Sequence, residues 1–304
     1  MEFGRIPGQD LDKVNFSLPL EPAGNRLVLT TAAAHPKVYL GCPRWGTKAW
    51  LGKIYPKGTK DSNFLDHYVK HFSCIEFNST HYQIFTPDVI AKWAAKAAGH
   101  DFKFCPKVPQ AISHHSGFNN VDQLTNSFLE GIAAFGEQLG PVFLQTSENY
   151  SPMQRSHLFK YLQTLPTNIQ FFLEVRHPDW FADPALHKEL FDTLRSLRIG
   201  AIITDTAGRR DVCHMELTVP KAFVRFVSNS LHPTDYTRID NWIARIKYWL
   251  QQGLQELYFI LHMPDEAFSP ELAAYMAEKM NAECGTSLPV PQFIQGVIQK
   301  SLFD

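Results

Sequence analysis

The feature of this chain that most constrains its fold is a short apolar segment that recurs along most of its length. Each run has five to seven residues, is nearly continuous, and is rich in Val, Ile and Phe. Runs of this kind are typical of parallel strands that are buried on both faces. The eight runs are VYLGC (38–42), CIEFN (74–78), DFKFC (101–105), PVFLQ (141–145), IQFFLEV (169–175), IGAIIT (199–204), AFVRFV (222–227) and ELYFILH (256–262).

Helical segments separate most of these runs, and several begin with a capping residue followed by proline. The capping oxygen is expected to accept a hydrogen bond from a free backbone N–H, and proline at the first helical position gives up no bond. The segments 185–198 and 240–253 are also amphipathic at helical spacing. The start signals are Thr86-Pro87, Ser151-Pro152, Asp183-Pro184 and Ser269-Pro270.

Eight strands that alternate with helices predict a TIM-type (β/α)8 barrel. The competing fold, a doubly wound sheet, usually has fewer strands and a GxGxxG first turn, which GCPRWG (41–46) does not match. Residues 206–220 show no convincing helix, so the crossover between strands six and seven is expected to be irregular. We predict a surface-packed N-terminal extension over 1–36 and a single barrel domain over 37–304.

Charge, hydropathy and cysteine usage narrow the class of protein. The net charge is −1, which does not predict a long basic stripe for duplex nucleic acid, although it leaves a local patch open. No apolar run approaches the roughly 18 residues of a membrane span, and the polar, acid-containing N-terminus does not resemble a signal peptide. The five cysteines are scattered without a CxxC pair, which favours reduced thiols and a cytoplasmic protein.

Polar residues stand at the end of nearly every apolar run, where a barrel carries its reactive groups. Their side chains should point into the mouth, because an unpaired charge under the outer helices is costly. Gln145, Glu174 and Asp205 are expected on one wall, with Glu76 and Lys107 on the other side. The strand-end residues are Glu76, Asn78, Lys107, Gln145, Glu174, Arg176, His177, Asp205, Arg225 and His262.

Each of these residues also has a purely structural interpretation. Glu174 and Arg176 could form an ordinary rim ion pair, and His177 with the residues after it could cap the next helix. Lys107 could be solvated, and His262 could be a satisfied core histidine. Arg225 is harder to explain in this way, because an arginine inside an apolar strand needs a carboxylate or an anionic ligand.

Several segments together resemble one family, domain-of-unknown-function family 72, the YecE-like proteins. They are GCPRWGTKAWLGKIYPKGT (41–59), IEFNSTHY (75–82), FKFCPKVPQAISH (102–114), GPVFLQT (140–146) and FLEVRHPDW (172–180). The resemblance implies a TIM-type barrel. It also implies a shared site of Glu76, Asn78, Tyr82, Lys107, Gln145, Glu174, Arg176, His177, Trp180 and Asp205.

The chain departs from this family pattern in three places. His81 stands where an aromatic residue is usual, and residues 225–228 read RFVS where the family tends to read Arg-x-His-Gly. Residues 261–268 replace an Asn-rich turn after strand eight. Because barrels often hold phosphate near strands seven and eight, these changes bear on substrate preference.

The first functional hypothesis is an acid–base hydrolase or isomerase acting on an anionic substrate, such as a phosphorylated sugar or a nucleic-acid fragment. Glu76 and Glu174 would face each other, with the pKa of the more buried carboxyl raised. The expected catalytic residues are Glu76, Glu174, Lys107, His177 and Asp205. The expected substrate-binding residues are Trp45, Asn78, Tyr82, Gln145, Arg176, Trp180, Arg225 and His262.

The second hypothesis is a non-catalytic protein that binds an anionic ligand or a nucleic-acid end. Carboxylates saturated by arginines would favour it. A metal is a separate question: Glu174, Asp205, His177 and His262 are acceptable ligand types for a divalent ion. Because no HxH or HExxH spacing occurs, a divalent metal is not favoured and no cofactor is assigned.

Overall fold

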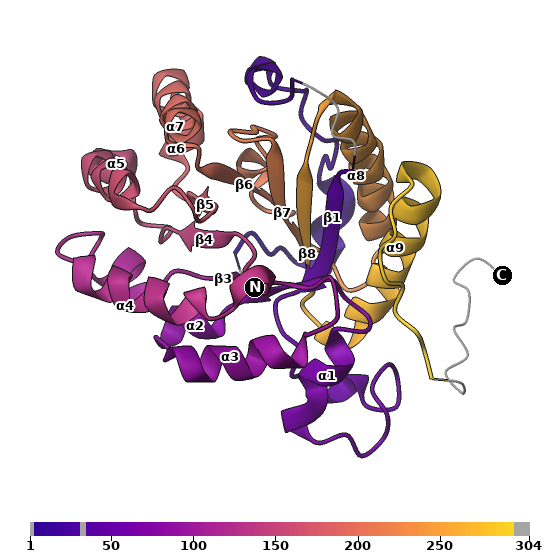
Figure 1. Ribbon diagram of the computed structural model, residues 1–304. Coiled ribbons are helices and arrows are strands. Elements are labelled where there is room, and N and C mark those ends of the chain that lie inside the picture. Colours follow the sequence, from indigo (N-terminus) through magenta and orange to yellow (C-terminus); the bar gives the residue numbers. More distant parts are fainter. Residues whose placement is uncertain (1–2, 31–34, 295–304) are drawn as a thin grey trace.

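The computed structural model describes residues 3–30 and 35–294, and its centre is a barrel of parallel strands (Figure 1). Within these ranges the eight predicted strands are all present, which confirms the TIM-type barrel. They are β1 (Lys37–Cys42), β2 (Cys74–Phe77), β3 (Lys103–Pro106), β4 (Val142–Gln145), β5 (Phe171–Glu174), β6 (Gly200–Asp205), β7 (Lys221–Val227) and β8 (Glu256–His262).

Strand pairing runs in the order β3-β2-β1-β8-β7-β6-β5-β4, so β3 and β4 are the two edges that must meet. They meet through isolated parallel bridges, Phe104 to Leu139 and Lys107 to Phe143. The backbone N–H of Val108 also donates to the carbonyl of Phe143, at 2.9 Å. The barrel is therefore closed by a few bonds at this seam rather than by a full ladder.

Helices surround the barrel on the outside (Figure 1). They are α1 (Phe64–Tyr68), α2 (Ser79–Tyr82), α3 (Pro87–Lys96), α4 (Asp122–Ala133), α5 (Arg155–Thr164), α6 (Asp179–Ala182), α7 (Pro184–Leu197), α8 (Pro233–Gln252) and α9 (Ser269–Cys284). Among the described helices, none is long and apolar enough to cross a membrane.

Helices begin near all four predicted start signals, but the capping prediction is correct for one of them. Asp183 accepts from the backbone N–H of Ala185 at 2.8 Å and of Leu186 at 3.3 Å. Thr86 makes no side-chain cap bond, and Ser151 precedes a short 3-10 turn without capping it. Ser269 lies inside its helix, where its hydroxyl donates to Glu266 at 3.3 Å. Proline, rather than the capping side chain, is the common element.

Two apolar layers follow from the alternation of side chains along each strand. Residues of one parity point outward and form the large core between the strands and the helices, as Phe171 and Leu173 do. Residues of the other parity fill the barrel interior, as Phe172 does. The interior cluster contains Tyr39, Cys74, Cys105, Phe143, Phe172, Ile202, Val219, Phe223, Tyr258 and Ile260. The next inward positions along the strands lie directly above this cluster, at the mouth.

The crossover between β6 and β7 is irregular, as predicted. Within residues 206–220 the structure has only a short 3-10 turn, Arg210–Val212, and no helix stands between α7 and α8. The N-terminal segment lies over this gap, and Figure 1 shows its indigo coil between α7 and α8. Pro19 and Glu21 accept hydrogen bonds from Arg245 and Trp249 of α8.

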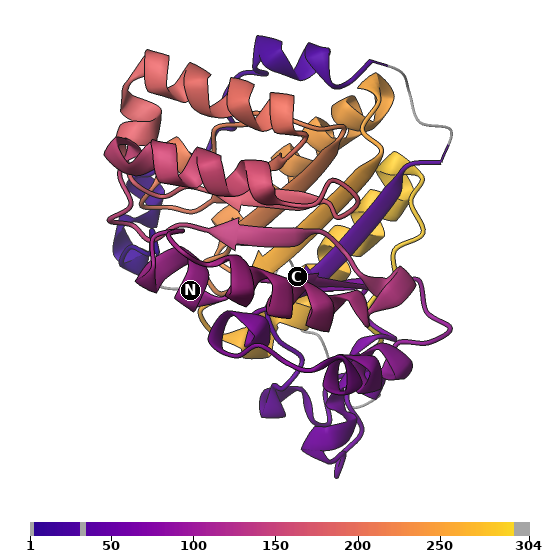
Figure 2. The same cartoon turned by 60° about the vertical axis from the view of Figure 1, so that its left-hand side comes forward.

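The N-terminal segment also spans the length of the barrel (Figure 2). At the mouth end, the carbonyl of Gly4 accepts from the N–H of Gly208 at 2.7 Å. At the opposite end, Asn25 accepts from the N–H of Leu217 at 2.7 Å. The segment thus occupies the place of the missing crossover helix. The predicted domain limits at 36 and 37 stay a prediction, and residues 1–2, 31–34 and 295–304 lie outside the described residues.

Candidate functional site

A polar layer closes the top of the barrel interior, one inward position above the apolar cluster. Its members come from most of the strands, because each strand places its next inward residue at the same height. All of them are buried, with Lys107 and Gln145 the most accessible at 7%. The layer consists of Glu76, Lys107, Gln145, Glu174, Thr204, Arg225 and His262.

Arg225 stands at the centre of this layer and binds two carboxylates. Its Nε and Nη2 donate to the two oxygens of Glu76, at 2.8 and 2.9 Å. Its Nη1 donates to Glu174 at 2.5 Å. The sequence predicted that an arginine in this apolar strand needs a carboxylate or an anionic ligand, and Arg225 has two carboxylate partners.

The two carboxylates have further donors. The Nε2 of His262 donates to Glu76 at 2.9 Å, and Asn78 donates to the same carboxylate at 2.9 Å. Glu174 accepts from Thr204 at 2.9 Å and from the Nε of Arg176 at 3.1 Å. The shared faces predicted for Glu76 with Asn78, and for Glu174 with Arg176, are present in the structure.

These donors reverse the pKa shift that the acid–base hypothesis required. Burial alone would raise the pKa of Glu76, but Arg225 and His262 hold it well below its usual range. Burial likewise opposes ionisation of Glu174, yet Arg176 and Arg225 lower its pKa to about 2. The expected raised pKa is wrong for both residues, because the positive charges outweigh desolvation. Both side chains are ionised near neutral pH.

Lys107 differs from its neighbours because its ammonium has a neutral partner. Its Nζ donates to the amide oxygen of Gln145 at 3.1 Å, and no carboxylate among the described residues lies within 4 Å of it. Burial, followed by the charge of Arg225, lowers the pKa of Lys107 to about 8. The nearby imidazoles His81 and His114 have pKa values lowered by burial to about 4, so both are neutral near pH 7.

Five members of the polar layer form the floor of a cavity of about 450 Å³, whereas Glu174 and Thr204 do not line it. Two charged residues on its wall were not singled out from the sequence: Arg44, in the loop after β1, and Glu266, in the turn after β8. Burial raises the pKa of Glu266 above its usual range. The lining residues are Pro43, Arg44, Glu76, Asn78, Ser79, Tyr82, Lys107, Gln145, Arg176, Arg225, His262 and Glu266.

Asp205 does not join this cavity, and its expected place on the wall beside Gln145 and Glu174 is wrong. Thr204 points inward to Glu174, so the next residue points outward. Asp205 lies under α8, where it accepts from the Nε1 of Trp242 at 2.7 Å and pairs with Arg238 at 3.0 Å. Alternation along β6 was the signal that would have identified Thr204 as the inward residue.

Two of the predicted stacking residues also lie away from the cavity. Trp180 is fully buried, and its indole N–H donates to the carbonyl of Tyr150 at 3.3 Å. Trp45 stacks on Phe77 with ring centroids 5.6 Å apart, on the outer side of β2. Tyr82 does line the cavity, and it is 73% exposed at the rim.

His177 lies just beyond β5 and is not among the residues that line the cavity. Its Nδ1 accepts from the backbone N–H of Asp179 at 3.3 Å, at the start of α6. This contact matches the helix-capping interpretation of His177. Among the described residues, no three His, Cys, Asp or Glu side chains converge as a group that could hold a metal ion.

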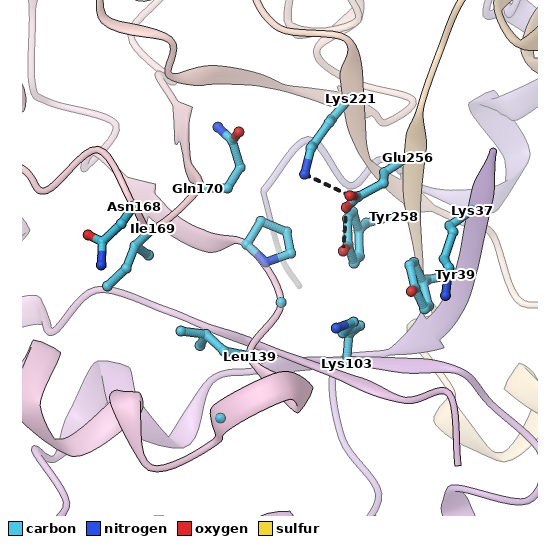
Figure 3. Close-up of a pocket in the computed structure, with 13 residues that line it drawn as sticks. Lys37, Tyr39, Lys103, Leu139, Asn168, Ile169, Gln170, Lys221, Glu256 and Tyr258 are labelled. Carbon is cyan, nitrogen blue, oxygen red and sulfur yellow. Dashed lines mark hydrogen bonds and ion pairs between the residues drawn. The ribbon is translucent and has the colours of Figure 1, made fainter. Parts of the chain in front are cut away.

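A second cavity, of about 410 Å³, opens at the other end of the barrel (Figure 3). Three of its four charged lining residues are paired, and the fourth, Lys103, donates to the backbone carbonyl of Glu137. Lys221 binds Glu256 at 2.7 Å, and the hydroxyl of Tyr258 donates to the same carboxylate at 2.9 Å. Lys37 binds Asp101 at 3.2 Å. Residues at this face of a barrel usually serve stability, whereas chemistry is placed at the mouth. We therefore take the mouth cavity as the candidate site.

Comparisons with known proteins agree with the fold. A family model described as "Protein of unknown function DUF72" matches residues 39–293. The UPF0759 protein YecE of Escherichia coli K12 is 28% identical over 287 residues, which cover 88% of this chain and 100% of that protein.

Two solved structures of DUF72 family proteins have the same fold. The one from Enterococcus faecalis V583 has a TM-score of 0.63 and 17% identity, over 82% of this chain and 99% of its own. The one from Thermotoga maritima MSB8 has a TM-score of 0.62 and 21% identity, over 81% of this chain and 100% of its own.

Proposed function

The chain belongs to the DUF72 family, and from that premise we propose that it is an enzyme performing acid–base chemistry on a small anionic substrate at the mouth of its barrel. The observation that carries the proposal is Lys107, a buried amine on the cavity wall that has no carboxylate partner among the described residues. Burying an unpaired ammonium is costly, so a lysine held in this way calls for an anionic ligand or a chemical task.

The protonation equilibrium of Lys107 suits proton transfer. With a pKa of about 8, about a tenth of the side chain is neutral at pH 7, and both forms are accessible during a reaction. Glu266 complements it, because burial raises the pKa of this carboxyl in the same cavity. Groups in one cavity whose pKa values are shifted toward neutrality are candidates for acid–base catalysis.

Glu76 and Glu174 have a different part in this proposal from the one expected from the sequence. Their low pKa values make them poor proton donors near neutral pH. They instead hold Arg225 and Arg176 in fixed positions in the cavity that Lys107 also lines. Two arginines balance these two carboxylates, so the positive charge left to stabilise negative charge on a substrate is that of Lys107.

The cavity also supports the anionic and small character of the substrate. Its volume of about 450 Å³ lies toward the lower end of the roughly 300–1,000 Å³ that ligand sites occupy. Arg44 and Arg176 line it together with Lys107. A phosphorylated sugar that is hydrolysed or isomerised fits these properties, and a nucleotide fragment is the alternative substrate.

One observation favours a second function, binding without turnover. Both carboxylates of the polar layer are saturated by arginine, histidine, threonine or asparagine donors, as expected of a rim built for recognition alone. A binding protein would use Lys107 as a positive charge only. The two functions therefore differ in whether the neutral form of Lys107 is used.

The test combines binding with turnover. Thermal stabilisation would be measured with inorganic phosphate, with a panel of sugar phosphates and with mononucleotides, and the same mixtures would be followed by NMR for product. Wild type would be compared with Lys107→Met and Lys107→Arg, and with Lys103→Met, which changes a lysine at the far end of the same strand. The proposal expects a compound that is turned over by wild type and Lys103→Met but by neither Lys107 variant.

The outcomes separate the alternatives. Stabilisation that depends on Lys107 and is retained in Lys107→Arg, without turnover of any compound, would support the binding protein. Stabilisation that is equal in wild type and Lys107→Met would reject the mouth as an anion site.

The cytoplasmic location is also part of this proposal. All five cysteines are free, and four of them are buried. Free thiols are typical of a reducing compartment. Alkylation of unfolded protein taken from unreduced cells should modify all five, and a protected pair would contradict the assignment.

A further inference from the structure

We propose that Lys107 is the nucleophile of this site and forms an imine with an anionic aldehyde or ketone, an inference that rests on the proposed function and names its substrate class. The argument begins with the contacts of the amine. One N–H is directed to the amide oxygen of Gln145, at 3.1 Å. That bond fixes the end of a long side chain without requiring a positive charge on it.

The surroundings of Lys107 increase the fraction of neutral amine relative to a free lysine. Arg225 is fixed by two carboxylates in the same layer, and Arg176 lines the same cavity. The Nζ of Lys107 also lies over the Phe143 ring, 5.7 Å from its centre, a cation–π contact that by itself favours the charged form and that burial and the arginines outweigh. A lysine that is desolvated and placed beside other cations is the arrangement that activates an amine for attack on a carbonyl.

The groups that face Lys107 from the neighbouring elements all bear on its titration. Glu76 and Glu174 favour the charged form, whereas Arg225 and Arg176 disfavour it. His81 and His114 are neutral near pH 7, because burial lowers the pKa of each to about 4. Burial has the largest effect, so the pKa falls to about 8 and the neutral fraction is larger than in a free lysine, although the charged form still predominates at pH 7.

The chemical step needs no reagent beyond the substrate. The lone pair of the neutral Nζ forms a C–N bond to the carbonyl carbon, and the C=O π pair moves to oxygen, which takes a proton while the nitrogen loses one. The hydroxyl of the resulting carbinolamine is protonated and leaves as water as the nitrogen lone pair completes the C=N bond, and the iminium then loses its N–H proton to give the imine. The net change is amine plus carbonyl giving imine plus water, and hydrolysis reverses it. We assign these proton transfers to Glu266, which lines the same cavity.

The anionic part of the substrate would lie toward the rim. Arg44 stands in the loop after β1, is 62% exposed and pairs with Glu266 at 3.6 Å, whereas Lys107 is at the buried end of the cavity. A substrate whose phosphate or carboxylate is held near the rim would direct its carbonyl inward to the amine. Short phosphorylated aldoses and ketoses have this arrangement of groups.

Reductive trapping tests the inference. The full chain is incubated at pH 7.5 with glyceraldehyde 3-phosphate and cyanoborohydride, and the modified lysine is located by peptide mapping. Because its amine is more often neutral, Lys107 should be modified about tenfold faster than any other lysine.

Inorganic phosphate should slow this modification. The Lys107→Arg variant should lose it, and Lys103→Arg should keep it. Thermal unfolding would establish that both variants are folded.

Adducts spread over the exposed lysines, with Lys107 unmodified, would overturn the inference. If Lys107 is unmodified but turnover in the earlier screen still requires it, the proposed acid–base function stands and only the imine fails. If anions neither stabilise the protein nor protect Lys107, both fail. A Lys107 adduct that phosphate does not slow would reject the anionic part of the substrate.

Discussion

Arg225 of β7 holds Glu76 of β2 through two parallel hydrogen bonds, Nε to Oε2 at 2.8 Å and Nη2 to Oε1 at 2.9 Å. Only the planar fork of arginine can make this contact, since lysine offers a single point charge. The third nitrogen of the same guanidinium reaches Glu174 of β5, at 2.5 Å. One side chain thereby fixes the relative positions of three strands at the mouth.

Replacing Arg225 should destabilise the fold strongly. Arg225→Met leaves two buried carboxylates without their main partner, a change that costs about 3–5 kcal/mol. The free energy of unfolding would be measured by urea denaturation. Arg155→Met is the control, because its pair with Glu189 is exposed and is worth about 1 kcal/mol or less. Equal urea midpoints for the two variants would contradict the central role of Arg225.

Stability should depend on pH through Glu174. Its pKa is lowered from 4.5 to about 2 in the folded protein, so the unfolded chain binds the proton more readily. The stabilisation is fully present above pH 4.5 and is lost as the pH falls toward 2. In this window wild type should lose up to about 1.4 kcal/mol per pH unit more than Glu174→Gln. The control is Glu130→Gln, at an exposed position, which should show the same dependence of unfolding free energy on pH as wild type. If Glu174→Gln also shows the wild-type dependence, the low pKa assigned to Glu174 is refuted.

Asp205→Asn should reduce stability without altering the mouth. Asp205 neutralises Arg238 beneath α8, and losing that charge should cost about 3 kcal/mol. Stabilisation of the variant by inorganic phosphate should match that of wild type, measured as the shift in Tm. Asp211→Asn, in a more exposed pair with Arg209, serves as the control. If phosphate no longer raises the Tm of Asp205→Asn but still raises that of Asp211→Asn, Asp205 does take part in the mouth site.

Gly41→Ala should be poorly tolerated although both residues are small. A Cβ at position 41 would lie 2.0 Å from the backbone carbonyl oxygen of Cys74, on the neighbouring strand. Because a backbone atom in a sheet cannot move aside, the expected cost is about 1–3 kcal/mol. Gly46→Ala, in the same GCPRWG segment, is the control, since no described atom lies within 4 Å of the added carbon. Similar unfolding free energies for the two variants would count against the close strand approach.

Removing residues 1–21 should expose the crossover between β6 and β7. Gly4 and Glu21 bond to the crossover and to α8, where a barrel would otherwise place a helix. Hydrogen exchange of the shortened chain should be faster across 206–220 than across the other loops, and the Tm should fall. Leu20→Ala is the control, because Leu20 is 91% exposed. Unchanged exchange in 206–220 would show that the segment does not protect it.

Glu174 and Asp205 show that a charged residue at the end of a strand need not face the mouth of the barrel. Both residues are charged, and each is the last residue of its strand. Their directions differ because β5 ends on an inward residue and β6 ends on an outward one. Alternate residues of a strand face opposite sides, so with Thr204 facing inward, Asp205 must face outward. This alternation would have distinguished the inward Glu174 from the outward Asp205.

The role of the N-terminal segment was less accessible to sequence reasoning. The absence of a helix in 206–220 is visible locally, because those residues lack helical periodicity. The segment that fills the space lies about 200 residues earlier in the chain, as in the contact of Thr206 with Gly4. Nothing in the composition of residues 3–30 indicates that they pack over the crossover between β6 and β7.

The sequence by itself determined the strands, their order in a barrel and the polar residues at their ends, because apolar runs and their spacing are local properties. Only the tertiary structure decided which charges meet. Arg225 contacts Glu76 and Glu174, which are 149 and 51 residues away, because closing the barrel brings β2, β5 and β7 to one axis. The same closure left Lys107 with a neutral partner. Pairing between distant charges depends on strand direction and height in the closed barrel, which no local pattern encodes.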